Sequence, residues 1–177
     1  MADKSKKSVL FVCLGNICRS TMAEIVFRAM VVERGLMDEW YIDSAGTSNY
    51  HIGDTPDHRT VEVCNQLLES TISKQAHQHF KSIPLHRGRQ FTEADMENFD
   101  FVFAMDDSNL SNMKKVVHHS RNKSNHKATM KRLGEYNTAK KLNVEDPYYG
   151  NMSTFRECYN HVFDCLQNFL KEQEQQQ

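Results

Sequence analysis

An apolar run near the N-terminus changes within a few residues into a helical pattern, and no other feature of the chain constrains the fold as strongly. Residues 9–12 are all apolar, which is typical of a strand buried in a parallel sheet. A loop that starts at Cys13 follows, and apolar residues at helical spacing begin at Met22. We therefore predict a strand, a tight loop and the N-terminus of a helix, which together begin a β-α-β unit.

The rest of the chain continues to alternate between strand and helix patterns. Strands are predicted at residues 40–45, 99–105 and 128–133, and helices at 20–34, 57–68, 92–98, 107–117 and from Ser153 onward, with Asp57, Thr92 and Ser153 as helix caps. This order predicts an α/β fold in which a four-stranded, mainly parallel twisted sheet has helices on both faces. We expect residues 1–177 to form a single domain, with the loop after the first strand at the carboxyl end of the sheet.

Two segments do not fit this alternation. Residues 69–87 are rich in Ser, Lys, Gln and His and have few apolar anchors, so we expect them to form an exposed insertion. Residues 172–177 contain only Glu and Gln, and we expect them to form a frayed tail.

Composition excludes several classes of protein. The chain has 177 residues and a formal net charge of −1, so a general affinity for nucleic acid or for anionic membranes is not expected. No apolar run is long enough to span a bilayer or to act as a secretory signal. We therefore expect a cytoplasmic protein whose five cysteines are free thiols. The spacing of its histidines matches no standard zinc pattern, so no metal site is predicted.

The loop after the first strand combines residue types that bind an anion. Backbone N–H groups in such a loop, and in the first turn of the following helix, have no internal acceptor. Gly15 lets the backbone approach a ligand, Asn16 tolerates positive φ, and Arg19 presents a planar fork to two phosphate oxygens. These groups favour the thiolate of Cys13, to which Ser20 can donate a hydrogen bond. The predicted chemistry is attack of sulfur on a bound phosphate.

A leaving alkoxide or phenolate needs a proton, so a general acid is expected opposite the nucleophile. Asp146 is the best candidate, because it lies in a loop whose direction is fixed by Pro147. Two tyrosines follow it and suggest an aromatic wall. The predicted mouth of the site, deep enough for phosphotyrosine, contains Leu14, Ile17, Tyr50, Tyr148 and Tyr149.

The string Cys13–Ser20 contains the C-x5-R phosphatase signature and resembles the low-molecular-weight protein tyrosine phosphatase family. Asp146–Gly150, just before the last helix, resembles the acid loop of that family, and the resemblance extends from Ser8 to Leu170. It implies a hydrolase of phosphotyrosine proteins and small aryl phosphates that forms a phosphocysteine on Cys13. Asp146 would act first as acid and then as base, while Arg19 holds the phosphate. The resemblance implies no cofactor, a monomer, and inorganic phosphate or other oxyanions as competitive ligands.

The same resemblance assigns supporting roles. The phosphate-binding loop would comprise Leu14, Gly15, Asn16, Ile17, Cys18 and Ser20, and a polar network of Asn16, Ser20, Ser44 and His86 would hold it. Cys18 would form a reversible disulfide with the nucleophile, and Tyr148 or Tyr149 would be phosphorylation targets. The chain departs from the family at Thr21, where proline is usual. We expect this change to loosen the loop and slow the enzyme, because proline pre-sets the first helical turn.

Two alternative functions remain open. An arsenate reductase of the same fold would need further redox cysteines, but Cys64 is the only cysteine between Cys18 and Cys158. A catalytically weak phosphotyrosine-binding module would not need both Cys13 and Asp146. Nucleotide binding is less favoured still, because neither a P-loop nor a dinucleotide-binding glycine motif is found.

Overall fold

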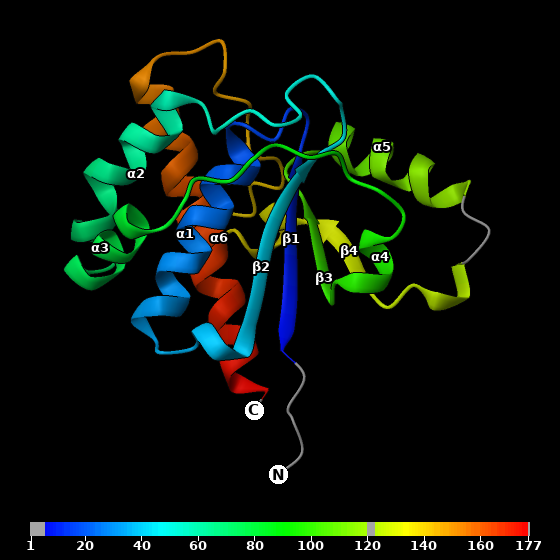
Figure 1. Cartoon of the computed structure of the whole chain (residues 1–177), viewed down its shortest axis with the longest axis horizontal. Helices are drawn as coiled ribbons and strands as arrows, with labels where there is room; N and C mark the ends of the chain where they lie inside the picture. The colour runs from blue at the N-terminus through cyan, green and yellow to red at the C-terminus, as the bar shows by residue number, and fades with distance from the viewer. Residues whose placement is uncertain (1–5, 120–122, 177) are drawn as a thin grey trace.

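Four parallel strands form the centre of the computed structural model, which describes residues 6–119 and 123–176 (Figure 1). The strands are β1 (Lys7–Cys13), β2 (Trp40–Gly46), β3 (Phe101–Ala104) and β4 (Thr129–Arg132), in the order β2-β1-β3-β4. β1 pairs with β2 from Lys7 opposite Trp40 to Cys13 opposite Gly46, and its other edge pairs with β3. The predicted parallel α/β sheet is confirmed, and the carboxyl ends of its strands lie along one edge.

Helices cover both faces of this sheet (Figure 1). One face carries α1 (Arg19–Glu33), α2 (His58–Thr71), α3 (Lys74–Ser82) and α6 (Met152–Gln175), and the other carries α4 (Asp95–Asn98) and α5 (Asp107–His118). Short 3₁₀ turns occur at Met37–Glu39, Lys123–Asn125 and Leu133–Tyr136. Within the described residues, no helix is both long and apolar enough to cross a membrane.

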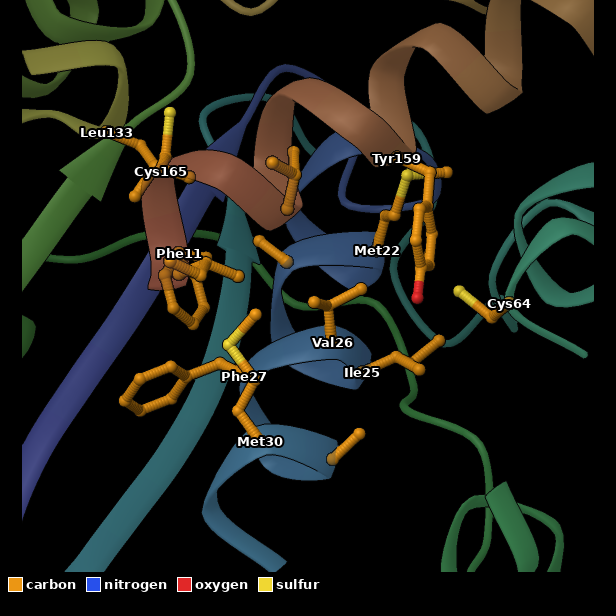
Figure 2. Packing of buried hydrophobic residues seen from close by; sticks show 14 of the residues in the cluster. Phe11, Met22, Ile25, Val26, Phe27, Met30, Cys64, Leu133, Tyr159 and Cys165 are labelled. Carbon is orange, nitrogen blue, oxygen red and sulfur yellow. The ribbon is translucent and has the colours of Figure 1, made fainter. Parts of the chain in front are cut away.

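Helix α1 is buried on nearly all sides, because it lies between the sheet and the outer helices. Figure 2 shows Val26 and Phe27 of α1 among the side chains of Phe11 on β1 and Tyr159 on α6. The ring of Phe11 contacts that of Phe27 edge-on, at a centroid distance of 5.9 Å. The N-terminus of α1 is therefore fixed in position by packing on several sides.

Most side chains of residues 69–87 are exposed, but this segment, which was expected to be an insertion, contains a helix that the sequence did not predict. α2 continues to Thr71, and α3 follows after a cap in which the Ser73 side chain accepts a hydrogen bond from the Ala76 N–H. Ala76 and Phe80 are buried, and both belong to the main core cluster. They are four residues apart and so share one helical face. The sequence pattern missed this helix because two apolar anchors in nine residues are a weak signal.

The prediction of a frayed tail at residues 172–177 was wrong over the described residues 172–176. α6 extends to Gln175. In its last turn, Glu172 accepts a hydrogen bond of 2.7 Å from the Tyr136 hydroxyl, and Glu174 forms an ion pair of 2.6 Å with Arg34. Gln173 is buried. These tertiary contacts hold a segment whose composition alone suggested fraying, while Gln177 lies outside the described residues.

Of the three predicted caps, one is replaced by a neighbouring residue, one is not formed and one is confirmed. The Asn151 side chain, rather than Ser153, caps α6 by accepting from the Thr154 N–H. α4 begins at Asp95, whose carboxylate accepts from the Thr92 N–H, so Thr92 does not act as a side-chain cap. The predicted cap at Asp57 is confirmed, because its side chain accepts from the Arg59 N–H at the start of α2.

Candidate active site

The phosphate loop, residues 14–18, lies between the carboxyl end of β1 and the N-terminus of α1. Its carbonyl oxygens are bonded away from the loop centre: Leu14 accepts from the Ser48 N–H at 3.0 Å and Ile17 from the Asp57 N–H at 2.8 Å. Among the described residues no acceptor is found for the N–H groups of residues 15–18. The loop therefore offers a row of donors, as an anion site requires.

Asn16 is at the centre of the supporting network. Its φ of 56° lies in the left-handed region, as the sequence suggested. Its Nδ2 donates to the Ser20 hydroxyl at 2.9 Å and to the Ser44 hydroxyl at 3.0 Å. Its Oδ1 accepts from the Arg89 N–H at 3.0 Å and lies 2.8 Å from His86 Nε2. The structure thus brings all four residues of the predicted network together, from four separate segments.

β2 ends beneath the loop at Gly46, where no side chain fits. A Cβ added at Gly46 would lie 2.8 Å from the Leu14 carbonyl oxygen and 3.2 Å from Asn16 Cβ. The close approach of the two backbones therefore requires glycine at this position.

Cys13 lies at the floor of a cavity of about 300 Å³ that the phosphate loop lines. Its side chain is buried, and its Sγ donates to the Ser20 hydroxyl at 3.1 Å. Arg19 and Asp146 line the same cavity. The predicted mouth residues Leu14, Ile17, Tyr50, Tyr148 and Tyr149 line it as well, together with His51, which the sequence did not suggest.

Arg19 is held in place by a residue that sequence reasoning missed. Its Nη1 donates to Asp106 at 2.6 Å and to the Val144 carbonyl oxygen at 3.0 Å. Burial works against the charged guanidinium, but the Cys13 sulfur and Asp106 favour it more strongly, so the pKa of Arg19 lies above its ordinary value. Asp106 lies shortly after the end of β3, at the carboxyl edge of the sheet. This position is the one signal by which the sequence could have indicated a site residue here.

Asp146 reaches the site from the loop before α6. Its Oδ2 lies 3.7 Å from Arg19 Nη2, and its Oδ1 accepts from the Tyr148 N–H at 3.1 Å. Its side chain is 39% exposed, so it can exchange protons with solvent. Tyr148 and Tyr149 meet edge to face with ring centroids 5.0 Å apart, and Tyr149 and Tyr50 are largely exposed.

Arg59 on α2, whose role was not predicted from the sequence, joins the loop that carries Asp146 to the phosphate loop. The guanidinium donates to the carbonyl oxygens of Tyr148 at 3.0 Å and Gly150 at 3.3 Å, and it forms an ion pair of 2.8 Å with Asp57. The hydrogen bond from Arg59 lowers the pKa of Asp57 more than burial raises it. The Asp57 N–H in turn donates to the Ile17 carbonyl oxygen in the phosphate loop. The Arg59–Asp57 ion pair therefore connects the loop that carries Asp146 to the phosphate loop.

Cys18 and Thr21 are both buried beside the loop. Burial raises the pKa of the Cys18 thiol, and the carboxylate of Asp57 raises it further. The Thr21 hydroxyl donates to the Cys18 carbonyl oxygen at 3.1 Å. This hydrogen bond stabilises the first turn of α1, where Thr21 stands in place of the proline that is usual in the family.

A cysteine, an arginine and an aspartate line one cavity at the carboxyl end of a parallel α/β sheet, and this arrangement favours a phosphatase. A family model described as "Low molecular weight phosphotyrosine protein phosphatase" matches residues 8–177. A relative of that name from Dictyostelium discoideum is 68% identical over 170 residues, covering 96% of this chain and 95% of the relative. The chain therefore belongs to the low molecular weight phosphotyrosine protein phosphatase family.

Solved structures agree with this assignment. A protein tyrosine phosphatase from Entamoeba histolytica, with Hepes in its active site, superposes with a TM-score of 0.78 at 29% identity, covering 96% of this chain and 98% of that one. A drosophila arginine phosphatase superposes with a TM-score of 0.77 at 31% identity, covering 93% and 96% of the two chains.

The role of Asn16 can be divided into a backbone part and a side-chain part. Both Asn16→Ala and Asn16→Gly remove the four side-chain contacts, but only glycine adopts the positive φ without strain. We expect both variants to bind inorganic phosphate more weakly than the wild type. Alanine should be the weaker of the two by roughly fivefold or more, because left-handed backbone costs a non-glycine residue about 1–2 kcal/mol.

Isothermal titration with phosphate measures this difference, and Asn160→Ala, an exposed position on α6, serves as control. Wild-type affinity in both Asn16 variants would show that the network does not shape the anion site.

Proposed function

We propose that this protein hydrolyses phosphotyrosine in proteins, and small aryl phosphates, through a phosphocysteine intermediate. One observation carries the proposal: a single cavity of about 300 Å³ is lined by Cys13, Arg19 and Asp146. These three groups supply a nucleophile, an anion clamp and a proton donor. The name of the family supports the same substrate class.

In the first step, the Cys13 thiolate attacks phosphorus, an S–P bond forms, and the bond from phosphorus to the aryl oxygen breaks. Asp146 donates its proton to that leaving oxygen. In the second step, Asp146 accepts a proton from water, which attacks phosphorus and releases phosphate. The S–P bond breaks, and the Ser20 hydroxyl donates to the returning thiolate. Arg19 and the loop amides hold the non-bridging oxygens throughout.

Aromatic and apolar side chains at the mouth favour an aryl ester. Ile17, Tyr50 and Tyr148 line the cavity above the loop. An aryl phosphate holds its phosphate farther from the peptide backbone than phosphoserine does, so it can reach a sulfur at the cavity floor. Inorganic phosphate and other oxyanions would compete for the same donors. We further propose that the protein acts as a cytoplasmic monomer.

The two alternatives have less support. An arsenate reductase relay needs further redox cysteines, but no described cysteine besides Cys13 and Cys18 lines the cavity. Burial raises the pKa of Cys158 to about 12, which disfavours its thiolate. A silent binding module would not need an acid, yet Asp146 is in place beside Arg19.

Leaving-group dependence tests the role of Asp146. We expect Cys13→Ser to abolish hydrolysis of both p-nitrophenyl phosphate and phenyl phosphate. Asp146→Ala should lose about 10²–10⁴-fold on phenyl phosphate, because a general acid contributes about that much, and clearly less on p-nitrophenyl phosphate, whose leaving group needs little protonation. Glu145→Ala removes the neighbouring, largely exposed carboxylate and should behave like the wild type.

Equal losses on both substrates would remove Asp146 from the acid role, and an active Cys13→Ser variant would overturn the covalent mechanism. Because one structural relative is an arginine phosphatase, a phosphoarginine peptide should be compared with a phosphotyrosine peptide. Faster hydrolysis of phosphoarginine would reject the proposed substrate class.

We also propose that Cys18 protects the nucleophile from over-oxidation, as the resemblance to the family implies. Peroxide would convert the Cys13 thiolate to a sulfenic acid, and the Cys18 thiol would then attack that sulfur, forming a disulfide and releasing water. Both cysteines are free in the structure. Mass spectrometry after mild peroxide treatment should find the Cys13–Cys18 disulfide in the wild type and faster sulfonic acid formation in Cys18→Ser. Sulfonic acid on Cys13 beside an unmodified Cys18 in the wild type would reject this role.

A further inference from the structure

The direction of the Asp146 carboxyl group depends on the backbone on either side of it. On the N-terminal side, the Val144 N–H donates to the Met105 carbonyl oxygen at 2.8 Å, which fixes the chain just beyond the end of β3. On the C-terminal side, residues 147–150 form a turn that one backbone hydrogen bond of 2.9 Å closes. The Tyr149 side chain at the tip of this turn is 93% exposed, so packing at the tip does not hold the turn. An attachment from outside the loop is therefore needed on this side.

Arg59 on α2 supplies that attachment. Its Nη1 donates to the carbonyl oxygens of Tyr148 at 3.0 Å and Gly150 at 3.3 Å, on either side of the tip of the turn. Over residues 6–119 and 123–176, it is the one side chain outside the loop that hydrogen-bonds to residues 147–150. The guanidinium carbon also lies 4.4 Å from the ring centroid of Phe155 and 5.5 Å from that of Tyr148. Arg59 therefore contacts the turn through both its backbone and a side chain.

Asp57 keeps the Arg59 guanidinium in one orientation. Arg59 Nε and Nη2 donate to the two carboxylate oxygens at 3.0 and 2.8 Å, a paired geometry that a guanidinium can form and an ammonium group cannot. The Asp57 side chain caps α2, and its N–H donates to the Ile17 carbonyl oxygen. The turn after Asp146 is thus held in a fixed relation to the loop that binds the anion.

We propose that Arg59 is a positioning residue for proton transfer, because it holds the turn that directs the Asp146 carboxyl group at the leaving oxygen. This inference rests on the proposed phosphatase mechanism. Arg59 is not among the residues that line the Cys13 cavity, so it acts through Asp146 and does not touch the substrate. Its removal should impair the protonation of the leaving group and should spare anion binding, which depends on Arg19 and the loop amides.

The Arg59→Met and Arg59→Lys variants test this role, since both keep a long stem beside Phe155 and lose the paired hydrogen bonds to Asp57. We expect kcat/KM on phenyl phosphate to fall at least about tenfold, because misplacing a reacting group by about 1 Å can cost about 10²-fold. On p-nitrophenyl phosphate, whose leaving group needs little protonation, the loss should stay within about threefold. Isothermal titration should find the affinity for inorganic phosphate within about twofold of the wild type.

A double variant separates a positioning role from a merely structural one. In the Asp146→Ala background, Arg59→Met should lower kcat/KM on phenyl phosphate by no more than about twofold further, because the group through which Arg59 acts is already absent. If the two losses multiply instead, Arg59 does not act through Asp146, and the inference is overturned.

Arg156→Met is the matched control. Arg156 is an exposed arginine of α6 whose Nη2 donates to Gln66 on α2 at 3.1 Å, so it joins the same two helices without touching the loop. This variant should match the wild type on both substrates. Asp57→Asn keeps a side chain that caps α2 and removes only the charge of the pair. It should show a smaller loss that is again confined to phenyl phosphate, and it preserves the test if Arg59→Met folds poorly.

The two substrates also separate this inference from the proposed function. Equal losses on both substrates in Arg59→Met, while Asp146→Ala still discriminates between them, would overturn the positioning role and leave the proposed function standing. If Asp146→Ala itself loses equally on both substrates, the proposed acid role fails, and the role of Arg59 fails with it.

Discussion

The hydrogen bonds of the Asn16 side chain are the interaction on which the rest of the site depends. They join the phosphate loop to α1 through Ser20, to β2 through Ser44, and to the segment after α3 through His86. They also hold Asn16 in the left-handed conformation that turns the loop around its centre. Because the loop carbonyls are bonded outward, the amides remain available for an anion. A sulfur at the floor of such a loop faces bound phosphate in one fixed geometry.

The packing of α1 makes this geometry durable. The helix is buried against the sheet on one side and against the outer helices on the other, so its N-terminus has little freedom to move. Arg19, in its first turn, is further held by Asp106 and Val144. Arg59 couples the acid loop to α2, whose N-terminal cap contacts the phosphate loop. Cys13 and Arg19 are thus placed by β1 and α1, and Asp146 lies in a loop that Arg59 joins to α2.

The sequence predicted the parts of this molecule that are encoded locally. The strand, loop and helix around Cys13 lie in one short stretch, and Asp146 is marked by the proline and tyrosines that follow it. It could not predict Asp106 or Arg59, because their roles arise only when distant segments meet. α3 was missed because its apolar face consists of Ala76 and Phe80 alone, and its burial depends on α1.

A second cavity, of about 420 Å³, is connected to the phosphate loop by one hydrogen bond. His86 lines this cavity and reaches the phosphate loop with Nε2 through Asn16. A change at one ring nitrogen can therefore reach the loop without touching the substrate.

Alkylation of Cys13 reports on the sulfur and on the anion site together, and so it is the decisive measurement. We expect iodoacetate, an anion, to alkylate Cys13 faster than neutral iodoacetamide does in the wild type, and inorganic phosphate to protect Cys13 in a saturable manner. If iodoacetamide reacts faster, or if saturating phosphate leaves the rate unchanged, the sulfur does not lie in an anion-binding loop.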